Sequence, residues 1–185
     1  MALTVNEIVE LFESRGARMY GSEPVTQLEH SLQCARLAEL AGAAPELVTA
    51  CLLHDIGHLL AVRDTNMDDG PITTDLDDVH QYFALPFLRS LFSDAVLEPV
   101  RLHVDAKRYL CRAESAYWAS LTNASKKSLD LQGGVFSPVE AEEFIRQPYA
   151  YEAVLLRRWD DQAKVTGLDT PDIHHFRRAM EACAA

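Results

Sequence analysis

The chain of 185 residues carries 17 Lys and Arg against 28 Asp and Glu, a formal net charge of −11, and 48% of its residues are hydrophobic. This composition predicts one soluble domain over residues 1–185 and excludes a disordered chain. The negative charge repels phosphate backbones and anionic lipid, so we expect neither a nucleic-acid nor a membrane partner. No apolar stretch reaches the roughly 20 residues of a membrane span, and the N-terminal residues are acidic where a signal peptide is basic. We therefore expect a cytoplasmic protein, and its oligomeric state stays open.

Apolar residues recur at helical spacing along nearly the whole chain. Two capping boxes, Thr4 with Glu7 and Thr26 with Glu29, predict helices that end near residues 16 and 42. Pro45 predicts the start of a third helix, which is expected to run to about residue 58.

The second half of the chain is also helical in pattern, after a long loop predicted over residues 61–79. Asp77 or Asp78 is expected to cap a helix that kinks at Pro86, and Ser93 to cap a helix that passes through His103. Further helices are expected over residues 114–131, 138–146, 150–164 and 171–183. Because hardly any segment alternates over a strand length, the predicted fold class is all-α.

Six imidazole and carboxylate side chains fall on inward faces of these helices. They are His30, His54, Asp55, His80, His103 and Asp160. Both groups bind first-row metals, and an Asp can bridge two ions through its two oxygens. For any single histidine of the set, a hydrogen-bonded core residue is the simpler explanation. The six groups together suit two metal ions. His54 and Asp55 can share a centre only if their helix runs close beside it, which the small Gly57 would allow.

The segment from His54 to Gly57, behind the apolar run 51–53, resembles the signature of the HD-domain superfamily, all-helical metal proteins with an H…HD…H…H…D ligand series. The whole series matches in order and approximate spacing. The resemblance implies a helical bundle around a dinuclear metal site. It assigns His30, His54, Asp55 and Asp160 to one metal, and it makes Asp55 the bridge to a second metal that His80 and His103 hold.

Six blocks within roughly residues 18–165 are similar to the organophosphonate-cleaving HD oxygenases of the PhnZ and TmpB type. The blocks lie at residues 27–35, 52–58, 106–110, 123–125, 132–134 and 158–160. This resemblance implies a mixed-valent diiron centre, Fe(II)/Fe(III), with O2 as cosubstrate. It also implies four side chains around the phosphonate of the substrate, namely Lys107, Ser125, Gln132 and Arg157. For Lys107 and Arg157 the alternative is a solvated helix face.

Three further residues match functional positions of that family. Tyr20 and Glu23 match a pair that closes over the metals in the resting enzyme and moves when substrate arrives. His58 matches a residue near the hydroxyl of the substrate, where it could move a proton. The alternatives are an ordinary surface Tyr and Glu, and a His58 that only orients a metal ligand.

The implied activity is O2-dependent cleavage of a carbon–phosphorus bond. The expected substrate is (R)-1-hydroxy-2-(trimethylammonio)ethylphosphonate, slightly favoured, or (R)-1-hydroxy-2-aminoethylphosphonate, giving glycine betaine or glycine plus phosphate. A second hypothesis is an HD phosphohydrolase that acts on a nucleotide or a small phosphate ester. A third is an idle HD domain that binds a small anion.

Overall fold

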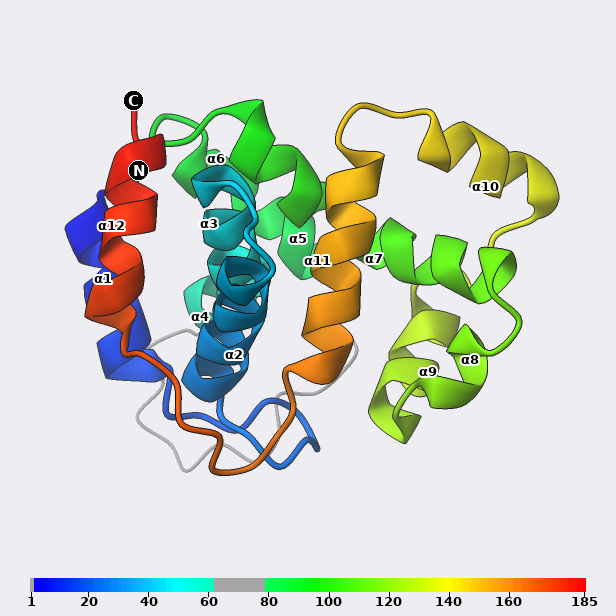
Figure 1. The fold of residues 1–185 in the computed structure, drawn as a ribbon, viewed down its shortest axis with the longest axis horizontal. Helices are drawn as coiled ribbons and strands as arrows, with labels where there is room; N and C mark the ends of the chain where they lie inside the picture. The colour runs from blue at the N-terminus through cyan, green and yellow to red at the C-terminus, as the bar shows by residue number, and fades with distance from the viewer. Residues whose placement is uncertain (1, 62–78) are drawn as a thin grey trace.

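The computed structural model describes residues 2–61 and 79–185. In chain order the helices are α1 (Val5–Arg15), α2 (Gln27–Leu40), α3 (Pro45–Leu53), α4 (Ile56–Leu60), α5 (His80–Phe83), α6 (Leu85–Leu88), α7 (Asp94–Ala113), α8 (Tyr117–Ser120), α9 (Asn123–Leu131), α10 (Pro138–Ile145), α11 (Ala150–Gln162) and α12 (Ile173–Cys183) (Figure 1). Those two ranges hold no strand, only isolated bridges that join Met19 to Thr26 and Phe92 to Ala184. The predicted all-α class is confirmed.

Helix α3 is the centre of the larger core. Its residues 47–53 are all buried, and it packs against α2, α7, α11 and α12. A helix that is apolar on every side is stable only when other helices surround it. The two residues that follow α3, His54 and Asp55, are consequently held inside the protein.

A second, smaller core joins the C-terminal half of α7 to helices α8 to α11. Figure 1 shows α7 and α11 between the larger bundle and the α8–α10 group. Both helices supply buried side chains to the two cores, such as Val100 and Leu110 from α7. Side chains on α7 and α11 are therefore fixed by packing on both sides.

Three predicted helices are wrong in their continuity. The helix predicted from Pro45 to about residue 58 is interrupted at Asp55, whose φ of −106° and ψ of 10° separate α3 from α4. The helix predicted over 114–131 is two helices, because Leu121 and Thr122 are extended and the Thr122 hydroxyl caps α9. Pro86 does not kink a helix but lies in the first turn of the short α6, where its missing N–H costs nothing.

The predicted helix starts are otherwise well placed. Both capping boxes, at Thr4 and Thr26, are formed, and Ser93 precedes α7 although its side chain makes no capping bond. The predicted caps at Asp77 and Asp78, and nearly all of the predicted loop, lie outside the described residues. None of the helices within the described ranges has the length and apolarity that a membrane span needs.

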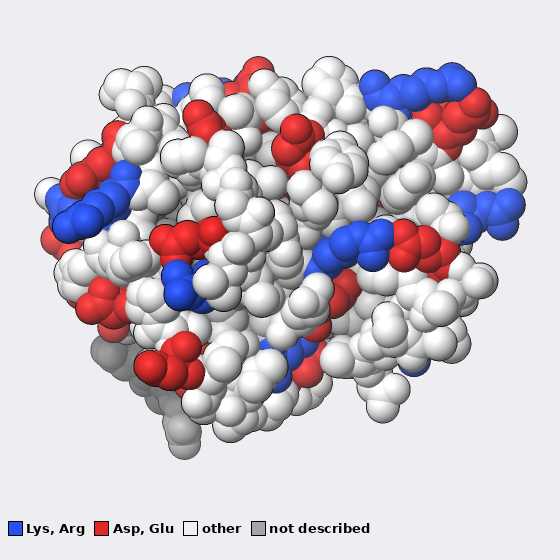
Figure 2. All heavy atoms as spheres, viewed as in Figure 1, with Lys and Arg blue, Asp and Glu red and all other residues white. Residues whose placement is uncertain are grey.

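Acidic and basic side chains are interspersed on the face of the molecule drawn in Figure 2. Ion pairs among the described residues include Arg101 with Glu98 at 2.7 Å and Arg158 with Glu114.

Candidate metal centre

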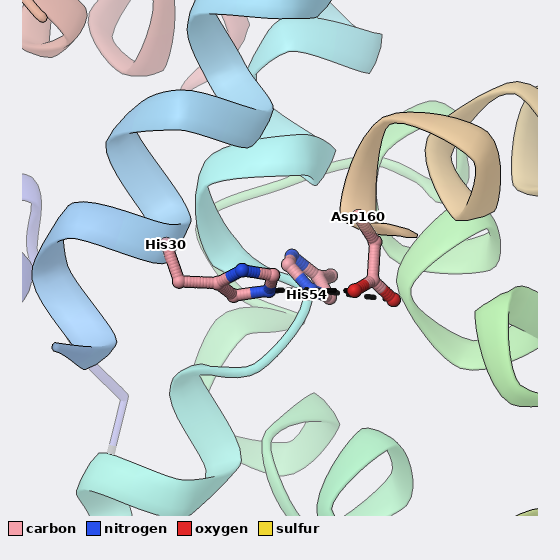
Figure 3. A group of neighbouring side chains, drawn as sticks. All are labelled: His30, His54 and Asp160. Carbon is pink, nitrogen blue, oxygen red and sulfur yellow. Dashed lines mark hydrogen bonds and ion pairs between the residues drawn. The ribbon is translucent and has the colours of Figure 1, made fainter. Parts of the chain in front are cut away.

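Three side chains that are distant in the sequence meet in the interior. His30 comes from α2, His54 follows α3, and Asp160 comes from α11 (Figure 3). The Nε2 atoms of His30 and His54 lie 3.2 Å apart, and the Asp160 carboxylate lies 3.5 Å from His30 and 3.9 Å from His54. Ligands about 2.1 Å from one metal ion are about 3.0 to 3.4 Å from each other. The spacing suits one shared cation.

A second cluster adjoins the first. It contains Asp55, His58 and His80, each with a ligand atom within 4.8 Å of the others. His103 completes it, because its Nε2 lies 3.1 Å from that of His80 and 3.5 Å from Asp55 Oδ1. The sequence analysis separated His58 from the ligands, yet its ring stacks on that of His80 at 4.2 Å. His58 therefore belongs to this cluster by position, next to the predicted ligand His80.

Asp55 is the link between the two clusters. Its Oδ2 faces His54 at 3.3 Å and His30 at 3.7 Å, while its Oδ1 faces His80 at 3.1 Å. A carboxylate with each oxygen aimed at a different imidazole group has the arrangement of a bridging ligand.

Three of the imidazoles are oriented by backbone carbonyls. The Nδ1 of His30 lies 2.8 Å from Ala163 O, and the Nδ1 of His103 lies 2.7 Å from Val100 O. His54 Nδ1 makes the equivalent bond, at 2.9 Å, to the carbonyl of residue 51. Since a carbonyl only accepts, each Nδ1 donates, and each neutral ring keeps a lone pair on Nε2. This is the usual way in which proteins orient a histidine ligand.

Burial opposes positive charge on two of these rings. It lowers the pKa of His30 to about 4 and that of His103 well below its usual value, so both are neutral at pH 7. Burial acts in the same direction on His54, but the adjoining Asp55 carboxylate outweighs it and raises the pKa of His54 to about 10. In the absence of a metal ion His54 therefore holds a proton, and its positive charge compensates the negative charge of Asp55.

Several carboxylate oxygens in the centre lack hydrogen-bond partners. Asp55 Oδ2 and both oxygens of Asp160 are buried without one. Arg157 Nη1 lies 2.6 Å from Asp160 Oδ2, an ion pair that lacks hydrogen-bonding geometry. Buried, unsatisfied carboxylates are costly. Cations between these oxygens and the Nε2 lone pairs would satisfy them, so the residues fit a pair of metal ions.

Tyr20 lies against this centre, and Glu23 follows it in a turn in which Glu23 N donates to the carbonyl of Tyr20. The Tyr20 ring stacks on the His30 ring with centroids 4.0 Å apart. Burial raises the pKa of the phenol well above its usual value, and the neighbouring Asp55 raises it further. Glu23 accepts a 2.6 Å hydrogen bond from the Thr122 hydroxyl at the start of α9. Neither is an ordinary surface side chain.

The four residues predicted to surround the phosphonate lie beside the centre. Three of them are on helices α7, α9 and α11, and Gln132 follows the last residue of α9. Lys107 on α7 and Arg157 on α11 are 2% and 5% exposed, which is incompatible with a solvated helix face. Ser125 is buried on α9, and Gln132, seven residues later on the same helix face, has a buried Oε1 without a partner. Among the described residues, no hydrogen bond or ion pair joins Gln132 to the other three. Burial, followed by the Arg157 charge, lowers the pKa of Lys107 to about 7.

Comparison with known proteins identifies the family. The HD domain model matches residues 28–128. A hydroxymethylphosphonate dioxygenase of Gimesia maris is 44% identical over 179 residues, which covers 97% of this chain and 87% of the relative. A [1-hydroxy-2-(trimethylamino)ethyl]phosphonate dioxygenase (glycine-betaine-forming) of Leisingera caerulea is 38% identical, over 90% of this chain and 83% of its own length. The chain belongs to the HD-domain phosphonate dioxygenases.

A likeness to HD phosphohydrolases is much shorter. A deoxyguanosinetriphosphate triphosphohydrolase-like protein of Streptomyces coelicolor is 46% identical over 48 residues, which is 23% of this chain and 11% of that protein. The family assignment therefore rests on the two dioxygenases, whose similarity extends over nearly the whole HD domain and the helices around it.

Three polar side chains at this HD-domain site were not predicted from the sequence. Lys107 Nζ donates to Ser128 Oγ at 2.7 Å, and Lys164 Nζ donates to Ser125 Oγ at 3.2 Å. The Thr122 hydroxyl also lies 3.2 Å from Ser125 Oγ. Ser128 could have been found, because it lies one turn after Ser125 on the same helix face. Lys164 follows the end of α11, where helical periodicity gives no signal.

Proposed function

We propose that the chain is an O2-dependent enzyme that cleaves the carbon–phosphorus bond of a 1-hydroxyphosphonate and releases inorganic phosphate. The observation that carries the proposal is the position of Asp55 between two histidine clusters. Beside these clusters lies a wall of two buried cationic side chains, Lys107 and Arg157. The names of the two dioxygenases that are similar over nearly the whole chain agree with it.

The proposed metals are two iron ions. His30, His54 and Asp160 would hold one, His80 and His103 the other, with Asp55 shared. Iron fits the proposed reaction because oxidation requires a metal that changes its oxidation state, which zinc does not do. When bound, the Fe(II)/Fe(III) pair would supply the activation of O2.

The phosphonate group would lie against Lys107, Ser125, Gln132 and Arg157. A phosphonate dianion needs cationic and neutral donors once water is excluded, and Arg can bind it through two parallel N–H groups. Lys107 would supply its buried ammonium, and Gln132 would supply the N–H groups of its amide. These groups would hold the C1 hydroxyl towards the metals.

Tyr20, Glu23 and His58 would act around the reacting carbon. The Tyr20 phenol, stacked on His30, would cover the centre until substrate displaces it. Glu23 would move with it, since Glu23 N donates to the carbonyl of Tyr20. His58, 4.0 Å from Asp55 Oδ1, would take the proton of the substrate hydroxyl.

The proposed reaction balances with one O2. The carbon–phosphorus bond breaks, C1 is oxidised to a carboxylate, and each product gains one oxygen atom. A 2-trimethylammonio or 2-amino substrate would give glycine betaine or glycine, and hydroxymethylphosphonate would give formate. The same residues serve all three substrates.

The test is phosphate release by iron-loaded, partly reduced protein with each of the three 1-hydroxyphosphonates, in the presence and absence of O2. We expect release that requires O2. Hydrolysis of a nucleotide without O2, and no release from any phosphonate, would refute the proposal and favour the phosphohydrolase hypothesis.

A further inference from the structure

Lys164 lies between the residues that cover the centre and the residues proposed to bind the phosphonate. Its side chain is only 9% exposed. Its Nζ donates to Ser125 Oγ at 3.2 Å, lies 3.7 Å from Glu23 Oε1, and lies 5.9 Å from the centroid of the Tyr20 ring. Lys164 therefore contacts one of the proposed phosphonate residues and one residue of the pair proposed to cover the metals.

Glu23 is already neutralised in this arrangement. It accepts the Thr122 hydroxyl at 2.6 Å and pairs with Lys164, and its own side chain is only 12% exposed. The other carboxylate that the described residues place at this wall, Asp161, is paired with Arg157 and accepts the Tyr117 hydroxyl. Within the described ranges, each wall carboxylate outside the metal cluster is thus paired with a cation.

This pairing has opposite consequences for the two ends of a substrate. The phosphonate gains a third cation near Ser125, since a charge-assisted hydrogen bond is stronger than a neutral one. A quaternary or primary ammonium on the carbon next to C1 would instead lie close to the Lys164 ammonium that binds the phosphonate beside Ser125. Like charges brought together in a poorly solvated site repel strongly.

We infer that Lys164 is a specificity-determining residue that binds the phosphonate side of the substrate and selects against a positively charged substituent on C1. The favoured substrate class is therefore a 1-hydroxyphosphonate with hydrogen or another uncharged group on C1. The inference rests on the proposed function. It reverses the slight preference for the trimethylammonio substrate that the sequence suggested.

The test compares wild-type protein with Lys164→Met and Lys164→Arg. We measure kcat/KM for hydroxymethylphosphonate and for 1-hydroxy-2-(trimethylammonio)ethylphosphonate. Wild type is expected to prefer the former by about tenfold or more, because only the latter brings a second positive charge close to Lys164. Lys164→Met should lower that ratio about tenfold, whereas Lys164→Arg should retain it. Lys127→Met, at an exposed position of α9, is the matched control and should leave the ratio unchanged.

Binding separates this inference from the proposed function. Calorimetric Kd values for the two phosphonates, measured without O2, should show the same preference and the same loss in Lys164→Met. Equal Kd values in wild type, tighter binding of the cationic substrate, or an unchanged ratio in Lys164→Met would overturn the role of Lys164, whatever the turnover. Failure of the proposed function would appear differently, as no O2-dependent phosphate release although the binding preference is present.

Discussion

The replacement Gly57→Ala tests whether close packing of α4 against α5 positions the second cluster. A Cβ at residue 57 would lie 2.2 Å from the carbonyl oxygen of His80 and 2.8 Å from its carbonyl carbon, whereas ordinary contacts begin at 3.4 Å. The backbone of His80 must therefore retreat by about 1.2 Å, the difference between 2.2 and 3.4 Å. Metal–ligand distances tolerate only about 0.2 Å, so the variant should lose His80 as a ligand.

The expected result is a drop from two bound metal ions per chain to about one, with loss of phosphate release. Metal content is measured by inductively coupled plasma mass spectrometry after anaerobic loading with iron. Overpacking of this kind costs about 1–3 kcal/mol of folding free energy, so a thermal melt must show that the variant is folded. Gly42→Ala is the control, because a Cβ there meets open space and its positive φ of 72° costs about 1 kcal/mol by itself. Two metal ions and full activity in Gly57→Ala would refute the argument.

Three further predictions follow from the same geometry. Asp55→Asn, whose amide nitrogen cannot ligate a metal, should weaken metal binding by more than about 100-fold in a metal titration. The control Asp105→Asn, on the outer side of α7, should not weaken it. Unchanged metal binding in Asp55→Asn would remove Asp55 as the bridge. Because the pKa of Lys107 is lowered to about 7, KM for the phosphonate should rise up to about tenfold per pH unit above pH 7 as the ammonium loses its proton. In Lys107→Arg that rise should disappear, since a guanidinium stays charged; a rise that persists would point to another group. Tyr20→Phe should increase O2 consumption in the absence of substrate, measured with an oxygen electrode, and an unchanged rate would show that the phenol does not shield the centre.

The ligand types could be predicted from the sequence, but the way in which they meet could not. Adjacent positions of a continuous helix point about 100° apart, which made it hard to place His54 and Asp55 at one centre. The structure removes the difficulty by ending α3 at Leu53, so that Asp55 occupies a non-helical turn and presents one oxygen to each cluster. The apolar pattern gives no sign of this break, because Leu52, Ile56 and Leu59 keep helical spacing across it.

The small residue at position 57 was predicted to allow a close approach, and the structure gives the reason. It is the backbone of His80, on a helix that the sequence separates from Gly57 by the long segment 62–78, that occupies the space. Contacts of this kind depend on tertiary packing and leave no periodic trace. The same holds for Lys164, which meets Glu23 across nearly the whole length of the chain.

Arg157 shows how the metal and anion sites depend on each other. Its guanidinium is paired with Asp160 and with Asp161, so in this arrangement it is held by carboxylates and not presented to an anion. A cation bound at Asp160 would share the charge of that carboxylate and weaken its attraction for Nη1, leaving Asp161 as the main partner. A guanidinium released from one of two carboxylates regains donors for a phosphonate. The proposed phosphonate binding would therefore be linked to metal binding at the centre, because both would draw on Arg157.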